Sequence, residues 1–329
     1  MNIVFLAPHC RISGGVKVIF RLAQGLVDRG HSVTVLVRKY NPLQLQAWFS
    51  YDKVSIQQMD EYETIPQCDV VVNYGDGGSF LRIPPNAKHV LFLQNFGVHD
   101  LISEKIAILY PYHAIIVVSN WLAEICHSAD TSNVFVVHPG VDQIFLEKHN
   151  EPVVGATANV GSLWHKEPWK NTVLFEAAML LLRKKIAIKP VLLSATITSI
   201  PVWKENNLPY SIIVDPPQQT LPALYESCPV WVSPSMHEGF GLTTLEAMAC
   251  GCAVVTVRNL GLDGFLQNKR NCYVVRDNKE AVANAVLELL TNRSIRAEIV
   301  KAGKALAGQF TWQKAIGAFH NALLDVVKK

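Results

Sequence analysis

The stretch that decides the fold is HEGFGLTTLEAMACG, residues 237–251. It follows the apolar run 230–233, which is typical of a buried strand, and it opens an alanine-rich helix that ends near Gly251. A strand, a glycine-flanked loop and a helix N-terminus together make an anion site, because unpaired backbone N–H groups and the positive dipole end face one place. Gly239 and Gly241 let a ligand approach the backbone closely.

Two carboxylates bracket this loop, Glu238 before it and Glu246 inside the helix. Eight helical steps rise about 12 Å and leave two side chains within about a quarter turn of each other. That span suits a site that grips both ends of a sugar–diphosphate–nucleoside. Thr243-x-x-Glu246 also has the pattern of a capping box, so in a second interpretation Glu246 only caps the start of the helix. Capping leaves Glu238 and the two glycines unexplained, and we therefore favour the ligand site.

Residues 233–242 (SPSMHEGFGL) and 246–251 (EAMACG) resemble the E-x7-E signature of retaining GT-B glycosyltransferases of the group 1, or glycosyltransferase family 4-like, type. In that family the second Glu holds the ribose hydroxyls of the donor, and the first Glu contacts the donor sugar. The resemblance therefore implies that Glu246 binds ribose and that Glu238 is the catalytic residue that positions the sugar. It assigns the donor diphosphate to the backbone of Gly239, Phe240, Gly241, Leu242 and Thr243.

Length and composition set the frame for this site. A chain of 329 residues exceeds what one hydrophobic core usually serves, so two domains are expected. Half of the residues are apolar and 17% are charged, which is typical of a globular protein. The net charge of +3 is too weak for a nucleic-acid binder. No apolar run approaches the roughly 20 residues of a spanning helix, and no signal peptide is evident, so we expect a cytoplasmic protein whose membrane association, if any, is peripheral.

The N-terminal half begins with a β-loop-α-β pattern, which indicates a parallel, doubly wound sheet. Its loop carries Gly14 and Gly15 but lacks the dinucleotide fingerprint. The glycine pair has two interpretations, a tight turn or a backbone pressed against the donor diphosphate across a cleft. The family carries a glycine pair here, which favours the second. Strands are expected at 3–7, 31–37, 54–57, 69–73, 89–93, 114–118 and 134–137, and helices at 18–27, 101–109 and 121–127.

The residues after the expected strand 89–93 depart from the family. Many members place a histidine there, near the transferring sugar, whereas this chain has Gln94 and Asn95 and reaches His99 later. Either His99 enters the site from a longer loop as a catalytic group, or an amide replaces the histidine. A third interpretation makes His99 an ordinary helix-start residue beside Asp100.

The C-terminal half repeats the doubly wound pattern from Val153. Strands are expected at 155–160, 190–193, 212–214, 230–233 and 253–257, and helices at 171–182, 221–225, 280–290, 295–308 and 312–327. The expected fold is α/β, with two Rossmann-like domains facing a cleft: residues 1–150 on the acceptor side and 151–310 on the donor side. Residues 309–312 (QFTW) resemble the family's entry to a last helix, so 311–329 should return to the N-terminal domain.

The second departure is Ser162. Relatives usually carry an arginine after the glycine at this point and a lysine a few residues later, and both neutralise the leaving diphosphate. Here Lys166 and Lys170 are the candidates for the remaining cation, and we favour Lys170 because it immediately precedes the helix. The loss of a bidentate cation matters at a site that must stabilise phosphate charge.

The sequence thus predicts a retaining, metal-independent hexosyltransferase. It would move a sugar from a nucleoside diphosphate to an acceptor hydroxyl, on a polysaccharide or glycolipid precursor, with no cofactor and a carbohydrate or lipid-linked acceptor. No carboxylate cluster resembles a Mg²⁺-diphosphate site. The alternatives are a non-catalytic nucleotide-sugar-binding protein, which Ser162 permits, and a nucleotide-sugar epimerase of the same architecture.

Overall fold

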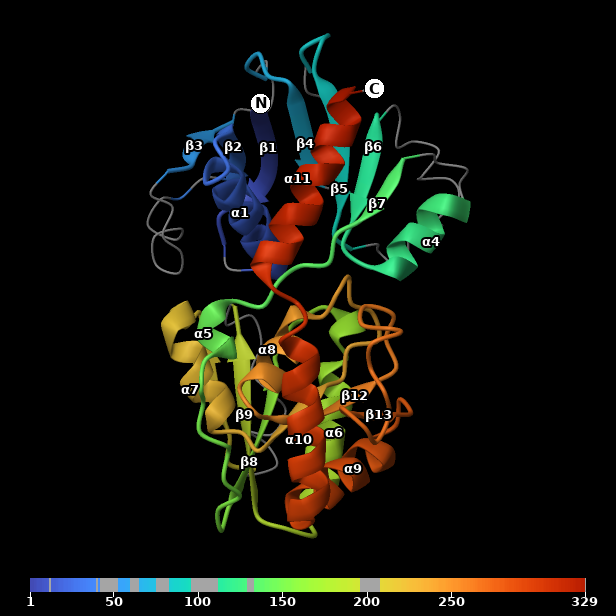
Figure 1. Ribbon diagram of the computed structural model, residues 1–329. Coiled ribbons are helices and arrows are strands. Elements are labelled where there is room, and N and C mark those ends of the chain that lie inside the picture. The colour runs from blue at the N-terminus through green and yellow to red at the C-terminus, as the bar shows by residue number, and fades with distance from the viewer. Residues whose placement is uncertain are drawn as a thin grey trace. The chain divides into compact units, whose positions relative to one another are not determined.

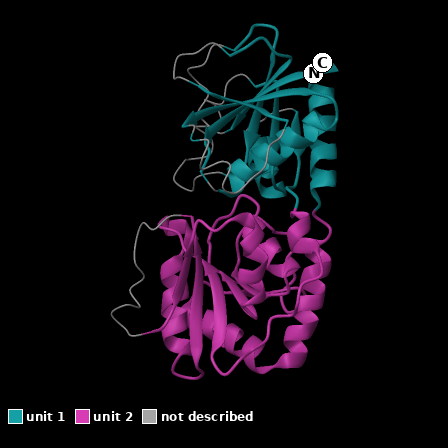
Figure 2. Cartoon of the chain, turned by 90° about the vertical axis from the view of Figure 1, so that its left-hand side faces the viewer, with its two compact units in different colours: residues 1–140, 311–329 teal, residues 141–310 magenta. Residues whose placement is uncertain are grey.

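The structure is a computed structural model that describes residues 1–11, 13–39, 41, 53–59, 65–74, 83–95, 112–128, 133–195 and 208–328 (Figure 1). The chain forms two compact units (Figure 2). Unit 1 comprises residues 1–140 with 311–329, and unit 2 comprises residues 141–310.

Unit 1 is built on a parallel sheet with the strand order β3-β2-β1-β4-β5-β6-β7 among the described residues. Its central strands are apolar along most of their length because helices cover both faces of such sheets. The order reverses between β1 and β4, as in a doubly wound fold. The strands are β1 (Asn2–His9), β2 (Ser32–Lys39), β3 (Ser55–Gln58), β4 (Val70–Tyr74), β5 (Lys88–Leu93), β6 (Ala114–Val117) and β7 (Val134–Val136).

The described helices of unit 1 are α1 (Gly14–Val27), α4 (Asn120–Ser128) and α11 (Trp312–Lys328). α1 begins where the Ser13 hydroxyl accepts a hydrogen bond from the backbone N–H of Val16 at 3.3 Å. α11 lies beside α1 (Figure 1). Its Phe319 ring stacks on Phe5, with ring centroids 5.8 Å apart, so the end of the chain belongs to the core of unit 1. The helix expected at 101–109 lies outside the described residues.

Unit 2 carries a second parallel sheet, in the order β10-β9-β8-β11-β12-β13. The strands are β8 (Ala158–Leu163), β9 (Ile188–Ser194), β10 (Ser211–Val214), β11 (Val230–Ser233), β12 (Ala253–Val257) and β13 (Tyr273–Val275). The helices are α5 (Gln143–Leu146), α6 (Thr172–Leu182), α7 (Leu221–Glu226), α8 (Leu242–Ala249), α9 (Lys279–Thr291) and α10 (Arg293–Ala307). The prediction of two doubly wound α/β sheets is confirmed.

Three local expectations need correction. The strand expected at 155–160 is β8, three residues later, so Gly161 and Ser162 lie in a central strand rather than in a loop. Ser162 is fully buried and pairs with Val232 of β11, and this pairing overrides the weak strand propensity of the small residues around it. The short strand β13 was missed. Unit 2 begins at Val141 rather than at 151, where the Val141 N–H donates to the carbonyl of Phe310 at 2.9 Å.

Candidate functional site

The candidate site lies at the carboxyl ends of β8 and β11, where the strand order of unit 2 reverses. In open α/β sheets ligands bind outside the carboxyl ends of the strands at this switch point. β8 leads into the segment 164–170, and β11 leads into the loop 234–241 that starts α8. The backbone N–H of Met236 donates to the carbonyl of Trp169 at 2.8 Å, which ties the two segments together.

α8 starts without a side-chain cap. Its N-cap residue is Gly241, which has a left-handed backbone with φ of 107°. A side chain would be strained in that conformation, so a glycine is required here. The capping-box interpretation is therefore wrong, because Thr243 lies inside the helix and Glu246 is its fifth residue. The first N–H groups of a helix lack intrahelical partners, and this N-terminus favours an anion.

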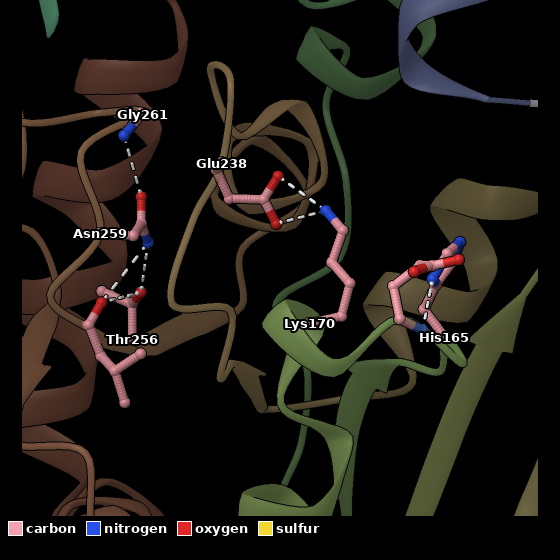
Figure 3. Close-up of polar contacts among 8 residues, drawn as sticks. His165, Lys170, Glu238, Thr256, Asn259 and Gly261 are labelled. Atoms are coloured by element: carbon pink, nitrogen blue, oxygen red, sulfur yellow. Dashed lines mark hydrogen bonds and ion pairs between the residues drawn. The ribbon is translucent and has the colours of Figure 1, made fainter. Parts of the chain in front are cut away.

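Lys170 and Glu238 form an ion pair beside this helix start (Figure 3). The Lys170 Nζ lies 2.8 Å from one carboxylate oxygen of Glu238 and 2.9 Å from the other. The exposed fractions of the two side chains are 19% and 13%, so water screens this pair less than a surface pair. Lys166, the other predicted cation, is exposed. Its role and that of Lys170 toward a donor stay predictions.

Glu246 is buried, with an exposed fraction of 5%. The hydroxyl of Tyr225, on α7, donates to its Oε2 at 3.1 Å. Sequence reasoning missed Tyr225, since a tyrosine on a short apolar helix carries no signal of its partner.

A turn after β12 supports the loop that carries Glu238. The buried Asn259 side chain donates to Thr256 Oγ1 at 3.2 Å and accepts from the backbone N–H of Gly261, also at 3.2 Å (Figure 3). A Cβ on Gly261 would lie 2.6 Å from the carbonyl oxygen of Phe240 and 2.9 Å from that of Glu238. Gly261 is thus in close contact with the candidate donor loop. Its position after a strand at the same sheet edge is the signal that could have identified it.

His165 lies on the segment that follows β8, five residues before Lys170, and was also missed. Its Nδ1 accepts a hydrogen bond from the backbone N–H of Glu167 at 3.2 Å. Burial, followed by the charge of Lys170, lowers the pKa of His165 below its usual range. The imidazole is therefore neutral near pH 7 and adds no second positive charge.

Ser162 places no cation at the site. Its exposed fraction is 0%, and its hydroxyl has no hydrogen-bond partner among the described residues. Where relatives usually carry an arginine, this chain therefore has a buried, neutral strand residue.

In unit 1, Gly14 is the first residue of α1, and Gly15 follows it. A Cβ on Gly15 would lie 2.8 Å from the hydroxyl oxygen of Tyr74, and the Gln94 amide donates to the Gly15 carbonyl at 3.0 Å. A side chain at position 15 would therefore have to displace Tyr74, so close packing within unit 1 favours glycine there, whatever its role toward a ligand. Asn95 is exposed, and His99 lies outside the described residues.

The described ranges contain neither a metal-binding cluster nor a membrane-spanning helix. There, no group of three or more His, Cys, Asp or Glu side chains is arranged to hold a metal ion. In the same part of the chain, no helix combines the length and the apolar character that crossing a membrane requires.

The chain is similar to glycosyltransferases in sequence and in fold. Residues 156–292 match the family described as "Glycosyl transferases group 1". A segment of 114 residues is 34% identical to D-inositol 3-phosphate glycosyltransferase of Salinispora arenicola (strain CNS-205), covering 34% of this chain and 25% of that protein. The match thus spans about a quarter of that relative.

Two solved structures share the fold along almost the whole chain. Sucrose-phosphate synthase from Thermosynechococcus elongatus has a TM-score of 0.80 at 17% identity, with 99% of both chains covered. Anabaena HepE, solved in complex with UDP-glucose, has a TM-score of 0.79 at 17% identity, with 99% of this chain and 100% of that chain covered. These similarities concern the fold.

Proposed function

We propose that the protein is a glycosyltransferase, because residues 156–292 match the group 1 glycosyl transferase family and the chain shares its fold with sucrose-phosphate synthase. It moves a sugar from a nucleoside diphosphate onto an acceptor hydroxyl with retention of configuration. The observation that carries the proposal is the arrangement of the Lys170–Glu238 ion pair beside the uncapped N-terminus of α8, with Glu246 buried on the same helix.

In this proposal the diphosphate binds at the start of α8, against the backbone of residues 239–243. The dipole and the N–H groups of the helix stabilise the phosphate charge there, and the glycine at 241 keeps the approach open. Glu246 accepts hydrogen bonds from the ribose hydroxyls. The nucleoside and the diphosphate are thereby held along one helix.

Lys170 changes partner when the donor binds. In the structure its ammonium group faces the Glu238 carboxylate. A diphosphate at the start of α8 attracts that ammonium group and leaves Glu238 to accept hydrogen bonds from the sugar hydroxyls. As the glycosidic bond breaks, Lys170 and the helix N-terminus stabilise the charge on the leaving nucleoside diphosphate. Because these groups take the part that a metal has elsewhere, the proposed reaction is metal-independent.

The S. arenicola relative is a D-inositol 3-phosphate glycosyltransferase, which favours a carbohydrate hydroxyl as acceptor here. We propose a polysaccharide or glycolipid precursor, hexosyl transfer, and a cytoplasmic protein whose contact with a membrane is peripheral. The roles that the family resemblance implies for Gly14, Gly15 and His99 stay predictions.

A donor panel tests the proposal. UDP-, GDP- and dTDP-sugars are screened by thermal shift, since a ligand at 100 times its Kd stabilises the folded protein by about 2.7 kcal/mol. The matching donor is then assayed for release of nucleoside diphosphate in the presence of carbohydrate acceptors. We expect one nucleotide class to raise the Tm and its sugar to turn over. A panel without any shift would contradict the proposal.

The buried, neutral Ser162 favours a second candidate, a non-catalytic nucleotide-sugar-binding protein. The same panel separates the two. A large shift by one donor, without release of nucleoside diphosphate under any acceptor condition, would favour the binding protein.

A further inference from the structure

The carboxylate of Glu246 is held by a buried tyrosine. The Tyr225 hydroxyl donates to the Oε2 of Glu246 at 3.1 Å, and Tyr225 is fully buried. A carboxylate that accepts hydrogen bonds from two neighbouring hydroxyl groups needs a fixed orientation. Without a partner it rotates widely about the last bond of the glutamate side chain. The hydrogen bond from Tyr225 to one carboxylate oxygen restricts that orientation.

The Tyr225 ring is itself held by its neighbours. Trp231 of β11 packs edge-on against it, with ring centroids 4.8 Å apart, and Phe145 does so at 6.0 Å. The Cys252 thiol donates to the Tyr225 carbonyl at 3.2 Å. The hydroxyl therefore has little freedom to leave Glu246.

The packing extends to Gly161 on β8. Gly161 and Trp231 are direct partners on neighbouring strands, and a Cβ on Gly161 would clash with the Trp231 ring. Only glycine leaves room for the indole at this point, so Gly161, Trp231 and Tyr225 form a continuous set of contacts that ends at Glu246.

The electrostatics keep the tyrosine a donor. Burial, together with the neighbouring Glu246 carboxylate, raises the pKa of Tyr225 well above its usual range. The phenol therefore stays protonated near neutral pH and can donate its hydrogen bond to the carboxylate.

We propose that Tyr225 is a positioning residue that orients the Glu246 carboxylate toward the two ribose hydroxyls of the donor. The protein thereby prefers ribonucleoside over 2′-deoxyribonucleoside diphosphates. This inference rests on the proposed function, which assigns the ribose to Glu246.

The test measures the Kd of UDP and of 2′-deoxy-UDP, and of the corresponding GDP pair, by isothermal titration calorimetry. The full-length wild-type chain is expected to prefer the ribonucleotide about tenfold or more, since hydrogen bonds to charged groups are among the stronger ones. Tyr225→Phe should weaken ribonucleotide binding about tenfold and leave 2′-deoxynucleotide binding nearly unchanged. The preference should therefore shrink, which a purely structural loss would not cause.

The matched control is Tyr273→Phe. Tyr273 is another buried tyrosine of unit 2 that interacts with a glutamate, Glu288, away from the site. Its variant loses a comparable hydroxyl and should keep the full ribose preference. If Tyr225→Phe does not fold, Trp231→Phe keeps the hydroxyl but loosens the ring, and it should reduce the preference by a smaller factor.

The outcomes separate this inference from the proposed function. Glu246→Gln should abolish the ribose preference. If it does, while Tyr225→Phe (or Trp231→Phe in its place) keeps the full preference, the positioning role is refuted and the ribose assignment stands. If Glu246→Gln also keeps the preference, or if the wild type binds neither pair, the ribose assignment and this inference are both overturned.

Discussion

Gly261→Ala is a small change with a large expected effect on the donor loop. The added Cβ would lie 2.6 Å from the Phe240 carbonyl oxygen and 2.9 Å from both the carbonyl oxygen and the Cβ of Glu238. Ordinary contact begins at 3.4 Å, so the distance must grow by about 0.8 Å at the Phe240 carbonyl oxygen and by about 0.5 Å at Glu238. The Phe240 ring is packed edge-on against Phe310, with centroids 5.3 Å apart, so the displacement should fall largely on Glu238.

A displacement of this size is enough to impair a catalytic site. A misplacement of about 1 Å can reduce turnover about 10²-fold, and overpacking of this kind destabilises by about 1–3 kcal/mol. We therefore expect kcat/KM for donor turnover to fall about 10- to 100-fold in Gly261→Ala, with nucleoside diphosphate release as the assay. The protein should remain folded at the assay temperature.

The control for this variant is Gly155→Ala, also in unit 2. A Cβ on Gly155 has only an ordinary contact, 3.6 Å from the Thr157 carbonyl oxygen, so its turnover should match that of the wild type. A folded Gly261→Ala protein with wild-type turnover would refute the view that Gly261 sets the position of the Glu238 loop.

Three further predictions concern other groups. Lys170→Met should weaken nucleoside diphosphate binding about tenfold or more, because a hydrogen bond to a charged group is worth roughly 1.5–3 kcal/mol. Lys166 is exposed, so Lys166→Met should change the Kd little. Equal losses of affinity in calorimetry would contradict the preference for Lys170. Burial lowers the pKa of His89 to about 4, so between pH 6.5 and 4 the unfolded chain binds a proton that the folded chain does not. Stability should therefore fall between pH 6.5 and 4, by up to about 3 kcal/mol more in the wild type than in His89→Phe, and parallel urea-unfolding profiles would refute this. Ser13→Ala removes the N-cap of α1 and should cost about 1 kcal/mol of unfolding free energy, so an unchanged urea midpoint would exclude a capping role.

Two strands near the site were predictable because turn residues mark where their apolar runs begin or end. β11 and β12 occupy the expected residues 230–233 and 253–257, since each is an apolar run with Pro or Gly nearby. β8 was placed three residues too early because the run ATANVGSL is rich in small and polar residues, and only its pairing between β9 and β11 makes it a strand.

The side-chain partners of the candidate site were not predictable from the sequence. Thr243 and Glu246 have the spacing of a capping box, but the helix begins after the left-handed Gly241, so Thr243 is not the N-cap. Glu246 instead accepts a hydrogen bond from Tyr225. The contact of Gly261 with the Glu238 loop likewise joins segments whose proximity arises only when β11 and β12 pair. Residue types and spacing indicated the chemistry, and tertiary packing decided which groups meet.

The most direct test of the proposed donor site is a crystal structure of the wild-type protein with the nucleoside diphosphate that gives the largest thermal shift. We predict the diphosphate at the N-terminus of α8, against the backbone of residues 239–243. Lys170 should have turned from Glu238 to a phosphate oxygen, and both ribose hydroxyls should donate to Glu246. A nucleotide bound away from α8, with the Lys170–Glu238 pair still closed, would contradict the proposed donor site.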